Sequence, residues 1–111
     1  MKLIFLTIFL FFLNHTFSFS DNFKFEKIAE LNDPWGSSFI SDNEIIVTEK
    51  SGKIKIINTL KKEIAEVEHN LNFLEYGQGG LLDIIYQNNT VWIAYTENRL
   101  NWKTSTSIAK A

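Results

Sequence analysis

Residues 44–58, which read Glu-Ile-Ile-Val-Thr-Glu-Lys-Ser-Gly-Lys-Ile-Lys-Ile-Ile-Asn, contain a clear hairpin pattern. The segment Glu44–Glu49 is dense in β-branched side chains, which favour strands. The pair Ser51-Gly52 that follows is typical of a hairpin turn. After the turn, Lys53–Asn58 alternates charged and apolar residues, as a strand with one face in water does. The stretch therefore predicts a β-hairpin.

Further strand patterns precede and follow this hairpin. Phe23–Leu31 predicts a first strand, which the turn signal Asn32-Asp33-Pro34 ends, because proline fixes its own φ and restricts the residue before it. Trp35–Ile40 predicts a short extended segment. Leu60–Val67 is ambiguous: its Glu and Lys content is compatible with a helix, whereas its β-branched residues fit an edge strand.

The second half of the chain repeats this layout. Leu81–Tyr86 predicts a largely buried strand, and Gln87-Asn88-Asn89 predicts a turn of residues that tolerate positive φ. Thr90–Thr96 is the strongest strand pattern in the sequence, and Thr104–Ala109 predicts the last strand. Short strands separated by turn signals in this way indicate an all-β sandwich, barrel or propeller.

The strands fall into two groups of similar size. Trp35–Val67 and Leu81–Ala109 each have the layout of one meander of three or four strands. Such a meander is the unit of a β-propeller blade, which typically has about 40–50 residues. The two groups share layout but not residues, so the sequence suggests a repeat without proving one.

Composition limits the classes of protein to be considered. The 111 residues include 11 Lys+Arg against 13 Asp+Glu, a formal net charge of -2, and no Cys. This length allows one small domain, and the lack of Cys excludes a disulfide scaffold, a Cys-ligated metal site and a thiol nucleophile. The slightly acidic balance argues against nucleic acid as a partner, since such proteins neutralise phosphates with excess Lys and Arg.

Residues 1–20 have the layout of a secretory signal peptide. A short positive region precedes the apolar stretch Leu3–Leu13, and Ser18 and Ser20 are the small residues expected at the -3 and -1 positions of a cleavage site. An apolar stretch of eleven residues is too short to span a bilayer, which needs about 20. We therefore expect residues 21–111 to be a periplasmic or secreted β domain without a stable membrane span. The alternatives are an uncleaved anchor and a buried N-terminal helix.

Three stretches, taken in order, resemble a known family. The stretches are Leu31–Ile54, which contains Pro34-Trp35-Gly36 and Val47-Thr48-Glu49; Gly77-Gln78-Gly79-Gly80-Leu81-Leu82-Asp83-Ile84; and Val91–Thr96. Together they resemble the opening of the soluble glucose/sorbosone dehydrogenases, the pyrroloquinoline quinone (PQQ)-dependent aldose sugar dehydrogenases. The resemblance covers most of residues 28–110. None of the three stretches is specific alone, but their combination at this spacing is.

This resemblance implies a six-bladed β-propeller, of which the chain would form the first one to two four-stranded blades. It also implies an exported oxidoreductase that binds PQQ in a basic, polar funnel, with calcium holding and polarising the cofactor. The reaction would oxidise a sugar at its anomeric carbon, with a His base taking the hydroxyl proton as hydride passes to PQQ. By position, Gln78 matches the family's Gln beside cofactor and substrate. Its amide can donate and accept, which suits a hydroxyl or a quinone oxygen.

Several features depart from the family's pattern. Lys50 stands where the family usually has Arg, which keeps the charge but loses the bidentate fork. Gln87-Asn88-Asn89 replaces the common His-Pro-Asp. The family's catalytic His, its calcium-binding carbonyls and most of its PQQ-binding Arg and Lys lie in later blades. No catalytic or metal-binding residue is therefore assigned in this chain, and we expect an N-terminal fragment that is inactive by itself.

The remaining conspicuous residues have simpler interpretations. The glycines of Gly77–Gly80 predict a turn into a strand rather than a phosphate-binding loop, since no helix or Lys-Ser/Thr pair follows them. His69 is expected to be a solvated loop residue. Asp83, inside an apolar strand, is expected to be a structural carboxylate with hydrogen-bond partners. Trp35 and Trp92 are expected in the core.

A second class of function stays open. The chain could be a small exported β-rich module that binds a glycan or a protein without catalysis, or part of a propeller with a non-enzymatic role. The signal-like start and the lack of an assembled catalytic set favour such a module, and the family resemblance disfavours it. The sequence identifies neither the sugar nor the electron acceptor.

Overall fold

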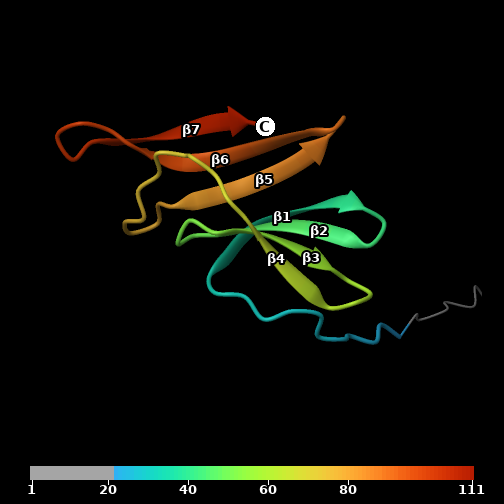
Figure 1. Cartoon of the computed structure of the whole chain (residues 1–111). Helices are drawn as coiled ribbons and strands as arrows, with labels where there is room; N and C mark the ends of the chain where they lie inside the picture. The colour runs from blue at the N-terminus through green and yellow to red at the C-terminus, as the bar shows by residue number, and fades with distance from the viewer. Residues whose placement is uncertain (1–21) are drawn as a thin grey trace, which may run out of the picture.

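The computed structural model describes residues 22–111, so the predicted signal peptide lies outside the described residues. The described chain is all-β and contains two antiparallel sheets (Figure 1). The seven strands are β1 (Pro34–Ser41), β2 (Glu44–Glu49), β3 (Ile54–Asn58), β4 (Glu63–Val67), β5 (Leu81–Gln87), β6 (Thr90–Asn98) and β7 (Thr104–Lys110). None of residues 22–111 belongs to a helix long and apolar enough to cross a membrane.

The first sheet has the order β1-β2-β3-β4, so each strand pairs with its neighbour in sequence. The predicted hairpin is confirmed, and β2 has the predicted bounds. Its turn closes where the Gly52 N–H donates to the Glu49 carbonyl, with Gly52 at a φ of 104°. The ambiguous segment Leu60–Val67 ends in the edge strand β4. A helix does not continue here because Lys62 takes a φ of 58° and residues 63–67 pair with β3 instead.

The second sheet has the order β5-β6-β7. Asn88 and Asn89 form the β5–β6 turn with φ values of 52° and 56°, as the predicted tolerance of positive φ requires. Two consecutive positive φ values match the twist of a tight hairpin. β6 continues past its predicted end to Asn98, and β7 reaches Lys110.

The strand predicted over Phe23–Leu31 is wrong. None of these residues belongs to a strand, and Phe25 is 92% exposed. Alternation fails within the segment, and a strand needs a partner for its backbone groups. Instead, Ile28 and Leu31 help to line an apolar hollow over the outer face of the first sheet, the face directed away from the second sheet.

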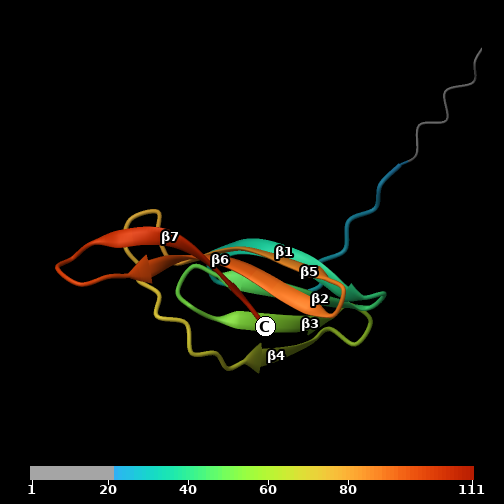
Figure 2. The same cartoon turned by 90° about the horizontal axis from the view of Figure 1, so that it is seen from above.

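The core lies between the two sheets. Strands β1 and β5 lie side by side where the sheets meet (Figures 1 and 2). The core consists of Ile46 and Ile54 from the first sheet with Leu81, Ile84, Ile93 and Tyr95 from the second. Ile93 and Tyr95 of β6 alternate as a period of two requires, whereas a register shift in β5 separates Leu81 from Ile84 by three positions.

Thr48 joins the two sheets at their closest approach. Its Oγ1 accepts the Gly36 N–H at 3.0 Å and donates to the Leu82 carbonyl. Glycine is required at position 36 because a Cβ there would lie 2.7 Å from the Cα of Asp83. The fully buried Thr48 hydroxyl therefore links β1, β2 and β5.

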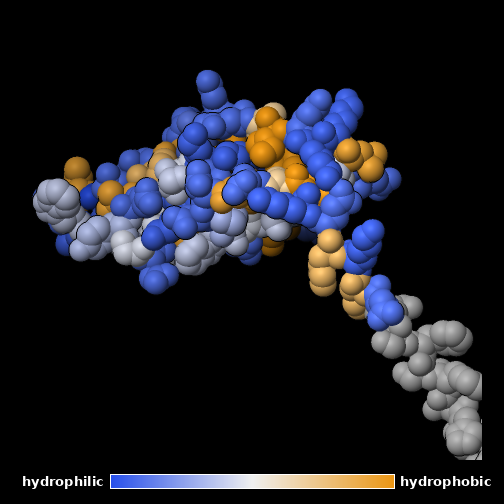
Figure 3. Space-filling view, turned by 90° about the horizontal axis from the view of Figure 1, so that it is seen from below, coloured by the Kyte–Doolittle hydropathy of each residue, from blue (hydrophilic) through white to orange (hydrophobic). Residues whose placement is uncertain are grey.

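Both tryptophans predicted for the core lie elsewhere. Trp35 is 50% exposed and Trp92 is 43% exposed. Trp92 pairs with Ile85, on the face of the second sheet directed away from the core. The sequence pattern predicted β5 and β6 as strands, but it cannot tell which of two apolar faces meets the other sheet. Apolar side chains accordingly reach the surface, including near the point where the N-terminal tail joins the sheets (Figure 3).

Candidate functional site

Three connections gather at one end of the two sheets. They are the β2–β3 turn, the connector of residues 68–80 between β4 and β5, and the β6–β7 loop, all at the left in Figure 1. We call this end the loop end. Because neighbouring strands are antiparallel, alternate connections must emerge at the same end of a sheet.

Backbone hydrogen bonds attach the connector to both sheets. On one side, the Leu81 N–H donates to the Lys50 carbonyl at 3.3 Å. On the other side, the Thr96 N–H donates to the Gly80 carbonyl at 2.8 Å, and the Leu74 N–H donates to the Thr96 carbonyl at 2.9 Å. The connector is therefore a fixed part of the loop end.

His69 fixes the same connector to the first sheet. Its Nδ1 accepts the Leu71 N–H at 3.2 Å, so Nε2 carries the proton and donates to the Gly52 carbonyl at 2.6 Å. The ring also lies 5.9 Å from that of Phe73. The prediction of a solvated loop residue is wrong, because His69 is half-buried and connects two loops.

The motif Gly77–Gly80 places Gln78 on the surface of the loop end. Gly80 has a φ of 150°, and a Cβ there would lie 2.2 Å from the Lys50 carbonyl oxygen, so only glycine fits. The predicted role of these glycines as a turn into a strand is confirmed. Gln78 is exposed, and none of the hydrogen bonds among residues 22–111 involves its side chain. Its amide is thus available to a ligand.

Lys50 lies beside this motif. Its side chain is half-buried, and it takes part in none of the ion pairs found among the described residues. A lysine ammonium without a carboxylate partner is suited to an anionic ligand.

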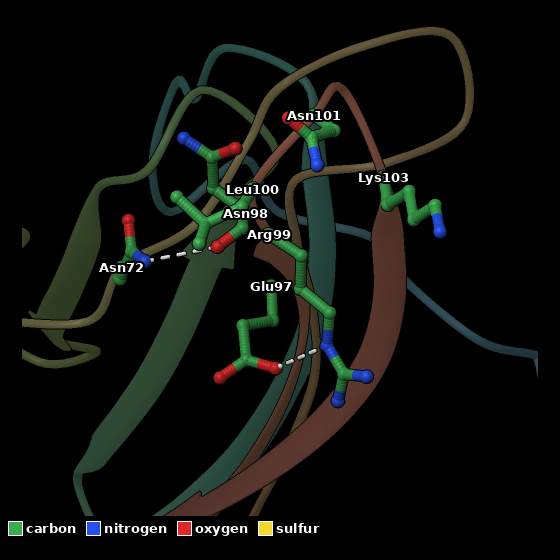
Figure 4. Close-up of a pocket in the computed structure, with 7 residues that line it drawn as sticks. All are labelled: Asn72, Glu97, Asn98, Arg99, Leu100, Asn101 and Lys103. Atoms are coloured by element: carbon green, nitrogen blue, oxygen red, sulfur yellow. Dashed lines mark hydrogen bonds and ion pairs between the residues drawn. The ribbon is translucent and has the colours of Figure 1, made fainter.

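A polar hollow of about 780 Å³ lies at the same end, next to the β6–β7 loop (Figure 4). Its lining residues are Asn72, Glu97, Asn98, Arg99, Leu100, Asn101 and Lys103. The Asn72 amide donates to the Asn98 carbonyl at 3.0 Å, which closes one wall. Amide, guanidinium and ammonium groups together give the hollow donors for hydroxyl or carboxylate oxygens.

Glu97 organises one side of this hollow. Its Oε2 accepts hydrogen bonds from Arg99 Nε at 3.0 Å and from the Ser107 hydroxyl at 3.1 Å. The hydrogen bond from Arg99, with further ones from Ser107 and Ser105, lowers the pKa of Glu97 although partial burial opposes this. Glu97 therefore stays ionised at neutral pH and holds Arg99 in place. Nothing in the sequence pattern pointed to this residue.

A buried ion pair supports the β2–β3 turn. The Glu49 side chain is fully buried, and its Oε1 accepts Lys55 Nζ and the Asn32 N–H, both at 2.8 Å. Burial alone would raise the pKa of Glu49, but the hydrogen bonds from Lys55 and Asn32 and the charges of Lys55 and Lys53 together lower it. Glu49 was part of the recognised Val-Thr-Glu motif, but its partner in the next strand was not foreseen.

Asp83 does not belong to the loop-end site; it has a hydrogen-bond partner, as expected, but it is exposed rather than enclosed in its apolar strand. The β5–β6 register shifts between Leu81 and Ile84, and such an irregularity redirects side chains. Asp83 is exposed, and its Oδ1 accepts the N–H of the next residue at 2.9 Å.

The glucose/sorbosone dehydrogenase family matches residues 31–111. The chain belongs to this family. Membership confirms the resemblance drawn from the three motifs. No curated protein matches the chain at a significant level.

Three solved structures of this kind resemble the described fold. The apo form of the soluble aldose sugar dehydrogenase from Escherichia coli is 26% identical over 72% of this chain and 25% of its own, with a TM-score of 0.65. The PQQ-bound aldose sugar dehydrogenase from Streptomyces coelicolor is 20% identical over 77% of this chain and 26% of its own, with a TM-score of 0.67. A glucose dehydrogenase is 21% identical over 72% of this chain and 25% of its own, with a TM-score of 0.66. This family member thus spans about a quarter of the length of each.

Proposed function

We propose that this chain forms the first one to two blades of a six-bladed β-propeller in an exported, PQQ-dependent aldose dehydrogenase. The family match over residues 31–111 carries the proposal. Two meanders packed face to face, with their connections gathered at one end, are compatible with neighbouring blades. The chain spans about a quarter of related structures, so the activity is proposed for the complete domain and not for these residues alone.

Within this proposal, the loop end is the cofactor side. A bound PQQ would supply the hydride acceptor for oxidation of a sugar at its anomeric carbon. Gln78 would donate to or accept from a cofactor or sugar oxygen through its exposed amide. Lys50 and Arg99 would place positive charge near the carboxylates of PQQ. The catalytic base is not assigned to any residue of this chain.

The remaining parts of the proposal rest on the family resemblance. They are an aldose substrate, a periplasmic or secreted location after removal of residues 1–20, and calcium beside PQQ. Among residues 22–111 no three His, Cys, Asp or Glu side chains come together in a way that could hold a metal ion. We therefore assign no calcium ligand in this chain.

Calorimetric titration of PQQ into the purified chain, with calcium present, tests the assignment of Gln78. We expect saturable binding that Gln78→Ala weakens about tenfold, which is the loss of one or two hydrogen bonds. Gln87→Ala is the matched control, because Gln87 is also exposed but ends β5 at the opposite end of the sheet. Equal affinities for the two variants would remove Gln78 from the cofactor side.

An activity assay separates the two classes of function. We expect no aldose-dependent dye reduction by the chain alone with PQQ and calcium. If PQQ fails to bind while an oligosaccharide binds at the loop end, the non-catalytic binding module becomes the better description.

A further inference from the structure

The polar hollow beside the β6–β7 loop lies on the inner side of the second sheet. Ile93, Tyr95 and Glu97 alternate along β6, so their side chains share one face, and the first two belong to the core between the sheets. Asn72 of the connector between β4 and β5 forms another wall of the hollow. Its volume of about 780 Å³ is within the range of about 300–1,000 Å³ that is common for ligand sites.

Two positive residues, Arg99 and Lys103, face each other at this hollow. The register of β6 and β7 ends with Asn98 opposite Thr104. The Arg99 N–H donates to the Lys103 carbonyl at 2.9 Å, which extends the ladder by one pair. Residues opposite each other in an antiparallel ladder have Cβ atoms about 5 Å apart and project from the same face. Two cationic side chains therefore emerge together on the face that carries Glu97.

The loop between these two cations has an unusual backbone. Asn101 and Trp102 both have a φ of 61°. A positive φ is uncommon for a residue as bulky as tryptophan, and residues held in such conformations cluster at ligand sites. The consequence here is a tight return of the chain, which brings Lys103 opposite Arg99.

A single carboxylate serves both cations. Oε2 of Glu97 accepts Arg99 Nε at 3.0 Å, and the two terminal guanidinium nitrogens lie on the side away from Glu97 (Figure 4). Lys103 takes part in none of the ion pairs found among residues 22–111. Like charges directly opposite each other destabilise a sheet, so an anion bound in the hollow would offset the remaining positive charge. A guanidinium binds a carboxylate with particularly good geometry.

Uncharged groups of the hollow complement these cations. Asn98 and Asn101 also line it, and none of the hydrogen bonds within the described part of the chain involves their side-chain amides. An amide can both donate to and accept from a hydroxyl group. A ligand that satisfies both sets of groups carries one carboxylate and several hydroxyls. A hexuronic acid, which is a sugar with a carboxylate at C6, combines these features.

We propose that this hollow binds the carboxylate and hydroxyls of a hexuronic acid, so that acidic sugars are a substrate class of the complete enzyme. The carboxylate of such a sugar is remote from its anomeric carbon, which stays free to react. The charge of Arg99 can still act on PQQ, because electrostatic interactions extend over about 10 Å at 0.1 M salt. That the ligand is a substrate rests on the proposed function, whereas its binding in the hollow does not.

Titration calorimetry of the purified chain with three probes tests the ligand class. D-Glucuronate carries both the carboxylate and the hydroxyls, D-glucose lacks the charge, and acetate lacks the hydroxyls. We expect the dissociation constant for D-glucuronate to be at least about tenfold lower than for either of the others, because charged and neutral hydrogen bonds both contribute.

Lys103→Gln tests the location of this binding. We expect it to weaken the binding of D-glucuronate about tenfold and to leave that of D-glucose within about twofold. Lys61→Gln is the matched control, because Lys61 is also exposed but lies in the β3–β4 turn, and it should leave both affinities unchanged. Arg99→Lys keeps the charge and loses the fork, so it should also weaken D-glucuronate binding, by about fivefold.

Three results would overturn the proposal. One is equal affinity for the three probes, and another is an equal effect of the Lys61 and Lys103 variants. The third is competition between PQQ and D-glucuronate with equal loss of both affinities in Lys103→Gln, which would assign the hollow to the cofactor. Binding of D-glucuronate that depends on Lys103 in a chain that does not bind PQQ would support the hollow as a sugar site and contradict the proposed cofactor side.

Discussion

The two sheets differ in what covers their outer faces. In the first sheet, Ile57 on the outer face is only 5% exposed, because residues 28–31 lie over that side. In the second sheet, Ile108 on the outer face is 72% exposed. The first sheet also contains the buried Glu49–Lys55 pair, whereas the charges of the second lie near its surface. The outer face of the first sheet is thus covered at Ile57 but not at Phe39, which is 64% exposed, whereas the outer face of the second is open at Ile108, so equal substitutions should have unequal effects.

The largest effect is expected from Glu49→Ala in the first sheet. The substitution leaves the largely buried Lys55 ammonium and the Asn32 N–H without their acceptor. Removing one partner of a buried ion pair costs about 4 kcal/mol of unfolding free energy. Urea unfolding followed by circular dichroism measures this loss of unfolding free energy. The double variant with Lys55→Met should recover most of the loss, and no recovery would mean that the pair is not coupled.

The next largest effect is expected from Ile84→Ala on the core face of β5, compared with Ile85→Ala on its outer face. Ile84 is 1% exposed and faces the first sheet, whereas its neighbour Ile85 is 54% exposed. We expect Ile84→Ala to cost about 3 kcal/mol through the cavity it leaves, and Ile85→Ala less than about 1 kcal/mol. Urea unfolding of both variants provides the measurement. Equal costs would show that the outer face of the second sheet is covered in solution.

Glu49 in the first sheet should make stability depend on pH. Glu49 has a pKa in the folded chain below its ordinary value of 4.5, so the unfolded chain binds its proton more readily. Its contribution is present above pH 4.5 and is lost as the pH falls through the lower, folded pKa. We expect the urea midpoint of the unmodified chain to fall more steeply below pH 4.5 than that of Glu49→Gln. Parallel profiles would assign the acid sensitivity to other carboxylates, such as Glu97.

The smallest effect is expected in the β5–β6 turn. Asn88 has a φ of 52°, which alanine adopts at a cost of about 1 kcal/mol. Asn88→Ala should therefore lower the thermal midpoint by a few degrees, while Asn88→Gly should leave it unchanged or raise it. A destabilising Asn88→Gly would mean that the asparagine side chain itself matters.

Local features of the fold were predictable from the sequence. The segment Glu44–Glu49 and the turn at residues 87–89 depend on residues close together in the chain, and both were predicted correctly. The predicted position of Trp92 was wrong because both faces of its strand carry apolar residues. Only the packing of the other sheet decides which of these faces lies in the core. The exposure of Asp83 could not be foreseen, because a shift in register has no sequence signal of its own.

The candidate site was predictable only in part. The motif around Gln78 identified the family, which the family match confirms, but the role of Gln78 stays a prediction. The hollow beside Glu97 and Arg99 could not be foreseen, because it depends on the β6–β7 loop meeting Asn72 of the connector. Such contacts between distant segments leave no periodic trace in the sequence.

The nearest-neighbour order of strands in both sheets has a consequence for how the chain folds. Every hairpin closes a short loop, which loses little chain entropy, so each meander can form early and without the other. Contacts of β5 with β1 and β2 join segments far apart in sequence and must wait for both meanders. The slow step of folding should therefore be the docking of two preformed sheets, with the Thr48 bridge completed last.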